Sequence, residues 1–258
     1  MPLVEMLAIL LAGMAAGTVN AIVGSGTLIT FPVLLAFGFP PVVANVSNNI
    51  GLVPGGVTAT LGYREELRGQ RRWIRVLAPM SLLGAVTGAL LLLRLPAEAF
   101  ATIVPVLLAI SLILVVTQPR IQASLARRRE AAPDSSGQPH RLLAMSGTYA
   151  AGVYGGYFGA AQGVLLVGLL GSLLPESLQR VNALKNLLSL IVNAVAALVF
   201  VTVARDSIDW RVVALIALGS LAGGYLGSRY GRRLPPPVLR GFIVVVGIVA
   251  IVRVVTSG

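Results

Sequence analysis

Two glycine-rich breaks interrupt apolar stretches of this sequence, and each carries polar side chains that could bind an anion. The first break is Gly24-Ser25-Gly26-Thr27, and the second runs from Gly159 to Gly163 and contains Gln162. A helix that begins inside a membrane directs its N-terminal N–H groups and the positive end of its dipole at the space before it, which favours anions. The alternative is that the glycines only permit close helix packing, as small residues do in membrane bundles.

An asparagine-bearing apolar segment follows each break. In the second half, Asn182, Asn186, Ser189 and Asn193 recur at spacings of four, three and four, so they share one face of a helix. The counterparts of Asn182, Lys185 and Asn186 in the first half are Asn45, Asn48 and Asn49. Each asparagine suits either a hydrogen bond between helices or a contact to a ligand, and the sequence does not decide between these roles.

Lys185 lies one to two turns into its apolar segment, where an unpaired central cation costs roughly 2.5–3.5 kcal/mol. Snorkelling of the side chain to the membrane surface is one solution. The nine acidic residues all fall in loops or at the ends of apolar segments, so an intramembrane salt bridge is not expected. An anionic substrate is therefore the expected partner of Lys185.

The composition excludes several classes of protein. The chain has no cysteine, and its single histidine, His140, lies in a polar stretch, so we expect no catalytic residues, no metal site and no cofactor. It is 56% hydrophobic and only 11% charged, with a mean hydropathy of +0.88, which indicates a multi-pass membrane protein. The net charge of +11 comes from arginine-rich loops between apolar segments, which fits the positive-inside rule of the cytoplasmic membrane and not nucleic-acid binding.

The apolar segments form two similar sets. Each half has a first span, a short segment, an asparagine-bearing helix and two further spans. The expected segments are 3–22, 27–38, 42–61, 76–93 and 99–117, then 142–158, 164–174, 178–203, 211–228 and 238–256. This division gives a first transmembrane repeat at 1–117, a basic cytoplasmic linker at 118–141 and a second transmembrane repeat at 142–258. The short segments are either full crossings or re-entrant.

Basic loops occupy opposite positions in the two halves. The loop at 63–75 carries five arginines, whereas its counterpart at 204–211 balances two arginines with two aspartates. Conversely, the turn at 94–98 has one arginine and one glutamate, so its charges balance, and its counterpart at 229–240 is strongly basic. Because arginine-rich loops face the cytoplasm, the sequence predicts an all-α polytopic membrane protein of two inverted repeats, each with about five helical segments and short broken helices.

The motif Gly17-Thr18-Val19-Asn20 with Gly24-Ser25-Gly26 resembles the glycine-rich break of the sulfite exporter TauE/SafE family, also called the four-toluene-sulfonate uptake permease family. The Pro40-Pro41 pair and the helix with Asn45, Asn48 and Asn49 resemble the family's next segment. A lysine often stands in the family where this chain has Asn48, so one cation is absent here. The resemblance implies transport of small sulfur-containing anions such as sulfite, sulfonates, sulfoacetate or thiosulfate.

We therefore expect a secondary transporter that binds a small anion between the two halves and works by alternating access. The alternatives are an anion channel and a membrane enzyme. The enzyme is disfavoured because the chain has no cysteine, no histidine within an apolar segment and no acid deep in one. The residues expected to bind the anion are Asn20, Gly24, Ser25, Gly26, Thr27, Asn45, Asn48, Asn49, Gly159, Gln162, Gly163, Asn182, Lys185 and Asn186. The expected partners are the anion and the lipid bilayer. The sequence leaves open the anion's identity, the transport direction, the coupling ion and homo-oligomerisation.

Overall fold

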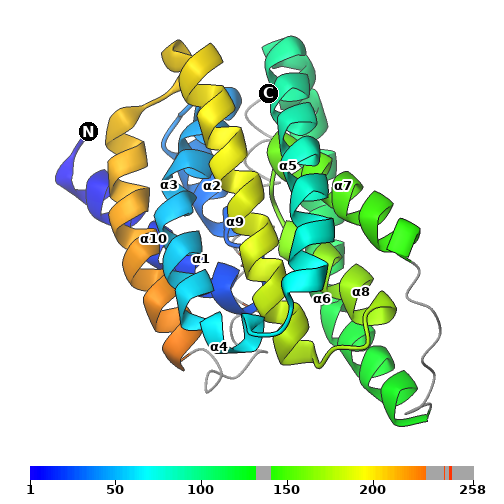
Figure 1. Ribbon diagram of the computed structural model, residues 1–258. Helices are drawn as coiled ribbons and strands as arrows, with labels where there is room; N and C mark the ends of the chain where they lie inside the picture. Colours follow the sequence, from blue (N-terminus) through cyan, green and yellow to red (C-terminus); the bar gives the residue numbers. More distant parts are fainter. Residues whose placement is uncertain (132–140, 231–240, 242–243, 246–258) are drawn as a thin grey trace.

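The computed structural model describes residues 1–131, 141–230, 241 and 244–245, and within these residues the chain is helical with no strand (Figure 1). The helices are α1 (Leu3–Ile22), α2 (Thr27–Ala36), α3 (Pro41–Gly62), α4 (Arg64–Leu67), α5 (Arg71–Arg94), α6 (Ala97–Ala131), α7 (Arg141–Tyr157), α8 (Gln162–Leu173), α9 (Leu178–Val203), the 3-10 helix η1 (Arg205–Ser207) and α10 (Trp210–Tyr230). Five of them, α1, α5, α6, α9 and α10, are long and apolar enough to cross a membrane. The prediction of an all-α polytopic membrane protein is confirmed.

The helix α6 is longer than the predicted span. The expected span ends at 117, but α6 continues through Pro119 to Ala131, into residues that the sequence suggested were a linker. The reason is that residues 120–131 consist mainly of alanine, leucine, arginine, glutamine and glutamate, which are strong helix formers despite their charge. Residues 132–140 and most of the expected segment 238–256 lie outside the described part of the chain.

The helix ends follow from local sequence. Pro41 is the first residue of α3, where its missing N–H is not needed. The Ser177 hydroxyl oxygen accepts the N–H of Arg180 and caps α9. An Asp209 carboxylate oxygen accepts the N–H groups of Arg211 and Val212 and caps α10 in the same way.

Helices of one half pack on helices of the other in a reciprocal pattern. The helix α10 packs on α1 and α3, while α5 packs on α7 and α9, and α3 and α9 meet each other between these groups (Figure 1). In this view α3 and α10 run downwards, and α9 and α5 run upwards. The helices α3 and α9 therefore run in opposite directions.

Small residues make this packing close. On α10, Gly219, Gly223 and Gly227 lie four residues apart and face the backbone of α1; a Cβ at Gly227 would sit 2.7 Å from the Thr18 carbonyl oxygen. On α5, Gly84 and Gly88 face the backbone of α7 in the same manner. Glycines at this spacing let helix backbones approach within a membrane, where the packing depends on such contact.

Candidate functional site

The two glycine breaks cross each other at the centre of the protein. The Gly163 N–H donates to the Gly24 carbonyl oxygen at 3.1 Å. A Cβ on either residue would lie 2.5 Å from the Cα of the other, so neither position has room for a side chain. Gly24 also has a φ of +87°, which L residues rarely adopt. At these two positions, therefore, the glycines serve close packing, which was the alternative reading of the sequence.

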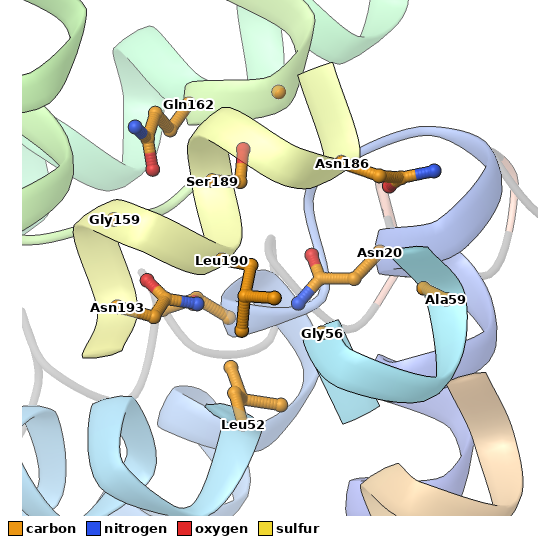
Figure 2. Close-up of a pocket in the computed structure, with 13 residues that line it drawn as sticks. Asn20, Leu52, Gly56, Ala59, Gly159, Gln162, Asn186, Ser189, Leu190 and Asn193 are labelled. Atoms are coloured by element: carbon orange, nitrogen blue, oxygen red, sulfur yellow. The ribbon is translucent and has the colours of Figure 1, made fainter. Parts of the chain in front are cut away.

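A small cavity lies beside this crossing, between α1, α2, α3, α8 and α9 (Figure 2). Its volume is about 30 Å³, enough for about two water molecules. The lining contains amides, hydroxyls, glycines and aliphatic side chains but no acidic or basic residue. Its members are Asn20, Gly24, Thr27, Leu52, Gly56, Ala59, Gly159, Gln162, Gly163, Asn186, Ser189, Leu190 and Asn193.

Two lining side chains carry buried polar atoms without a partner. The Gln162 amide nitrogen Nε2 and the Ser189 hydroxyl oxygen Oγ are buried and make no hydrogen bond. Figure 2 shows Gln162 near Ser189, with Asn193, Leu190 and Asn20 along the opposite side in this view. A buried polar atom left unpaired costs about 1–3 kcal/mol, so donors of this kind suit a ligand that would accept their hydrogen bonds.

The asparagines at the cavity already hold parts of the protein in place. The Asn20 Oδ1 accepts the Gly26 N–H at 2.6 Å, at the start of α2. The Asn186 Nδ2 donates to the Ala21 carbonyl at 3.2 Å, and the Asn193 Oδ1 accepts from Asn49 at 3.4 Å. Part of the hydrogen-bonding capacity expected for a ligand, including one N–H at the break before α2, is thus used within the protein.

Lys185 is completely buried and does not line the cavity. Its ammonium donates to the carbonyl oxygens of Asn20 at 2.9 Å and Ala21 at 3.5 Å, at the C-terminal end of α1. No carboxylate pairs with Lys185 in the part of the chain that the structure describes. The C-terminal end of a helix carries partial negative charge, so it is a suitable partner for a cation. The sequence predicts an anionic substrate as the partner of Lys185 and does not indicate these carbonyls.

The Lys185 side chain nevertheless runs close to the cavity. Its Cδ atom would lie 3.2 Å from a Cβ at Gly24 and 2.8 Å from one at Gly163, and both glycines line the cavity. Among the described residues, its ammonium donates only to neutral carbonyl groups. The positive charge is therefore incompletely compensated beside a cavity that lacks acids.

The other asparagines connect the two halves. The Asn45 Nδ2 donates to the Tyr157 carbonyl at 2.9 Å, at the end of α7, and the Asn182 Nδ2 donates to the Ala21 carbonyl at 3.3 Å, near the end of α1. Each asparagine-bearing helix thus caps the first helix of the other half. Asn48 donates to the Thr27 hydroxyl at 3.3 Å and accepts from the Thr30 hydroxyl.

The structure brings only part of the predicted site to the cavity. The predicted residues that line it are Asn20, Gly24, Thr27, Gly159, Gln162, Gly163 and Asn186. Those that do not line it are Ser25, Gly26, Asn45, Asn48, Asn49, Asn182 and Lys185. The prediction omitted Ser189 and Asn193, although both lie on the polar stripe with Asn186, and continuing that stripe would have found them. Nothing in the sequence marked Leu52, Gly56, Ala59 or Leu190.

Among the described residues, no group of three or more histidines, cysteines or acids lies close enough to hold a metal ion. The cavity lining presents neutral hydrogen-bonding groups, and the side chain of Lys185 runs close to it.

Comparison with known proteins gives consistent results. The model of the family described as "Sulfite exporter TauE/SafE" matches residues 9–254. The chain is 26% identical to the probable membrane transporter protein YfcA of Escherichia coli K12 over 92% of its own length and 84% of the relative's. It is also 26% identical to a probable membrane transporter protein of Haemophilus influenzae, over 98% of its length and 95% of the relative's. A third relative, the probable membrane transporter protein ORF9 of a Sinorhizobium species, is 26% identical over 95% of the chain and 90% of its own. No solved structure matches.

Proposed function

Because the chain belongs to the sulfite exporter TauE/SafE family and is a membrane transporter and not an enzyme, we propose that it carries a small sulfur oxyanion or organosulfonate across the cytoplasmic membrane. The binding site is the cavity beside the Gly24–Gly163 crossing. Gln162 and Ser189 donate hydrogen bonds to the anion, and Lys185 attracts it without touching it.

The observation that carries this proposal is the pair of unpartnered buried polar atoms, Gln162 Nε2 and Ser189 Oγ, in a cavity without carboxylates. An amide nitrogen donates only, so it is matched to an acceptor such as a sulfite or sulfonate oxygen. A divalent cation would favour carboxylate ligands, and the lining offers none. The lining therefore favours an anion over a divalent cation.

The size of the cavity supports transport by a change of conformation. A volume of about 30 Å³ accommodates about two waters, which is too little for the four heavy atoms of sulfite or the larger organosulfonates. The cavity walls come from both halves, with α1, α2 and α3 on one side and α8 and α9 on the other. A relative movement of the halves enlarges the cavity and opens it to one side of the membrane at a time.

The arrangement of charges supports one orientation. In Figure 1 the end of α3, the start of α5, the start of α9 and the end of α10 lie at the same lower end. This end carries the arginine-rich loop around Arg68, together with Arg180 and Arg229, and we place it in the cytoplasm. The opposite end carries η1 and the start of α10, where Asp206 and Asp209 balance Arg205 and Arg211.

A thermal-shift panel on detergent-purified protein tests the substrate class. The anions are sulfite, thiosulfate, sulfoacetate, an aromatic sulfonate, sulfate and chloride. An anion present at 100 times its dissociation constant should stabilise the folded protein by about 2.7 kcal/mol. We expect stabilisation by one or more of the first four and none by chloride. A panel in which every anion acts alike, in proportion to ionic strength, would contradict the proposed substrate class.

A further inference from the structure

A hollow of about 490 Å³ lies on the outer surface where α3 and α10 end, away from the central cavity. Its lining residues are Thr58, Leu61, Gly62, Arg64, Glu65, Tyr225, Ser228 and Arg229. None of them lines the cavity beside the Gly24–Gly163 crossing.

The hollow has excess positive charge. Arg229 donates to the Tyr225 hydroxyl, and its guanidinium lies 5.7 Å from the ring centre of Tyr225 and 5.8 Å from that of Tyr230. It forms no ion pair among the described residues. A guanidinium has five N–H donors, so this arrangement leaves donors for an anionic group.

The single acid of the hollow does not cancel this charge. Glu65 pairs with Arg68 at 2.8 Å and only more distantly with Arg64, at 3.7 Å. Arg68 is outside the hollow and compensates the carboxylate, so both lining arginines, Arg64 and Arg229, remain to attract an anion. The two side chains and the hydroxyl of Ser228 surround the same space.

An exposed apolar surface leads to the hollow along both helices. On α3, Val57 and Leu61 precede Arg64 at spacings of four and three, and they are 41% and 59% exposed. On α10, Leu218, Leu221 and Tyr225 precede Arg229 at spacings of three, four and four, and are all strongly exposed. The Thr58 hydroxyl donates to the Leu221 carbonyl at 3.1 Å, which places the two rows side by side. The row on α10 lies along one helix face and ends in Arg229, and the row on α3 is followed by Arg64, the first residue of α4.

We infer that this hollow binds an anionic phospholipid, with the phosphate of the headgroup between Arg64 and Arg229 and an acyl chain along the apolar rows. Arginine forks match phosphate oxygens, and basic pockets at the ends of membrane helices select anionic headgroups. The tyrosines at the edge of the hollow suit the depth of the headgroups. A soluble phosphate would share the arginine chemistry but would leave the apolar rows unused, so the structure favours the lipid.

Native mass spectrometry of the full chain tests this assignment. Wild-type protein is released from vesicles of equal parts phosphatidylglycerol and phosphatidylcholine, and bound lipids are counted. Each arginine near an anionic surface contributes about fivefold to affinity, so we expect the double variant Arg64→Gln/Arg229→Gln to lose about 25-fold in preference for phosphatidylglycerol. The matched control, Arg205→Gln/Arg211→Gln, removes the same charge at the other end of the molecule and should keep the preference.

Three outcomes would overturn the assignment. These are a wild-type protein that retains both lipids equally, a double variant that keeps the preference, and a control that loses it to the same extent. A separate arm adds inorganic phosphate to lipid-free protein. If phosphate raises the melting temperature as much as phosphatidylglycerol does, the hollow is a soluble-phosphate site and not a lipid site. An unchanged melting temperature of the lipid-free double variant shows that it is folded.

Discussion

At the scale of single residues, the most informative side chain is Gln162. It is 3% exposed, lines the central cavity and leaves its amide nitrogen without a hydrogen-bond acceptor. The protein therefore retains a polar group that its own packing does not use. A ligand with an oxygen acceptor removes the cost of this unpaired donor.

Replacement of Gln162 by leucine should abolish anion-dependent stabilisation and leave the unliganded protein as stable as wild type or more so. The reason is that the substitution removes a donor whose burial costs about 1–3 kcal/mol when it is unpaired. Thermal unfolding with and without the stabilising anion measures both effects.

The control for this substitution is Ser81→Ala. Ser81 is also fully buried with an unpartnered hydroxyl, but it does not line the cavity. The Ser81→Ala variant should keep the full anion-dependent shift in melting temperature. An equal loss of the shift in both variants would mean that the cavity assignment is wrong.

Lys185 should influence anion binding through its charge. A unit charge within about 8 Å of an anion contributes about 2 kcal/mol at an effective dielectric constant near 20, so Lys185→Met should weaken anion binding about thirtyfold. Isothermal titration of both proteins with the stabilising anion measures the change.

Asn182→Leu separates this effect from the capping of α1. Asn182 donates to the Ala21 carbonyl, as Lys185 does, but is neutral and does not line the cavity. The Asn182→Leu variant should lose about 1 kcal/mol of unfolding free energy and bind the anion as wild type does. If the two variants weaken binding equally, Lys185 acts by holding α1 and not through its charge.

At the scale of elements, the crossing of the two breaks holds the broken helices together. Gly24→Ala should destabilise the protein by about 1–2 kcal/mol of backbone strain plus about 1–3 kcal/mol of overpacking against Gly163. Gly38 provides the matched control, because it also has a positive φ, of +83°, but a Cβ there meets nothing within 4 Å. Gly38→Ala should show the strain alone, and unfolding in detergent compares the two. Equal losses would show that the crossing contributes nothing.

Most helix positions could be predicted from the sequence, because long apolar segments and their proline and glycine ends are local signals. The bounds of α1 and α9 match the predicted segments 3–22 and 178–203. The helix α6 continues beyond the predicted span 99–117, because residues 120–131 are strong helix formers as well as charged.

The site was harder to predict because it depends on contacts between the halves. Local sequence marked Gln162 and Gly163, but only the fold shows that the end of α1 supplies the carbonyl partners of Lys185. The same holds for Leu52 and Leu190, which reach the cavity from α3 and α9 through packing that no local pattern encodes.

At the scale of the whole molecule, the proposed inverted arrangement of the two halves makes a direct prediction. The chain has no cysteine, so single cysteines can be introduced without removing others. Arg68→Cys, at the basic end, should react only with a reagent on the cytoplasmic side, and Ser207→Cys, on η1, only with one on the outside. Labelling of intact cells with an impermeant maleimide measures this accessibility. Labelling of both positions from the same side would contradict the inverted repeats.

A carrier and an anion channel differ in what a preloaded vesicle does. In a carrier, a binding site that faces the inside takes up an unlabelled anion and returns with it to the outside. The unlabelled anion inside therefore exchanges with labelled anion outside. The central cavity holds only about two waters, so we expect such a cycle of conformations for each anion.

The measurement that tests the central claim most directly is sulfite counterflow in proteoliposomes, with radiolabelled sulfite outside and excess unlabelled sulfite inside. We predict that label transiently accumulates above its equilibrium level in vesicles with wild-type protein, and that Gln162→Leu removes this overshoot. Label that only equilibrates, without saturation or overshoot, would indicate a channel. A protein-dependent overshoot that Gln162→Leu leaves unchanged would contradict the assignment of the central cavity as the anion site.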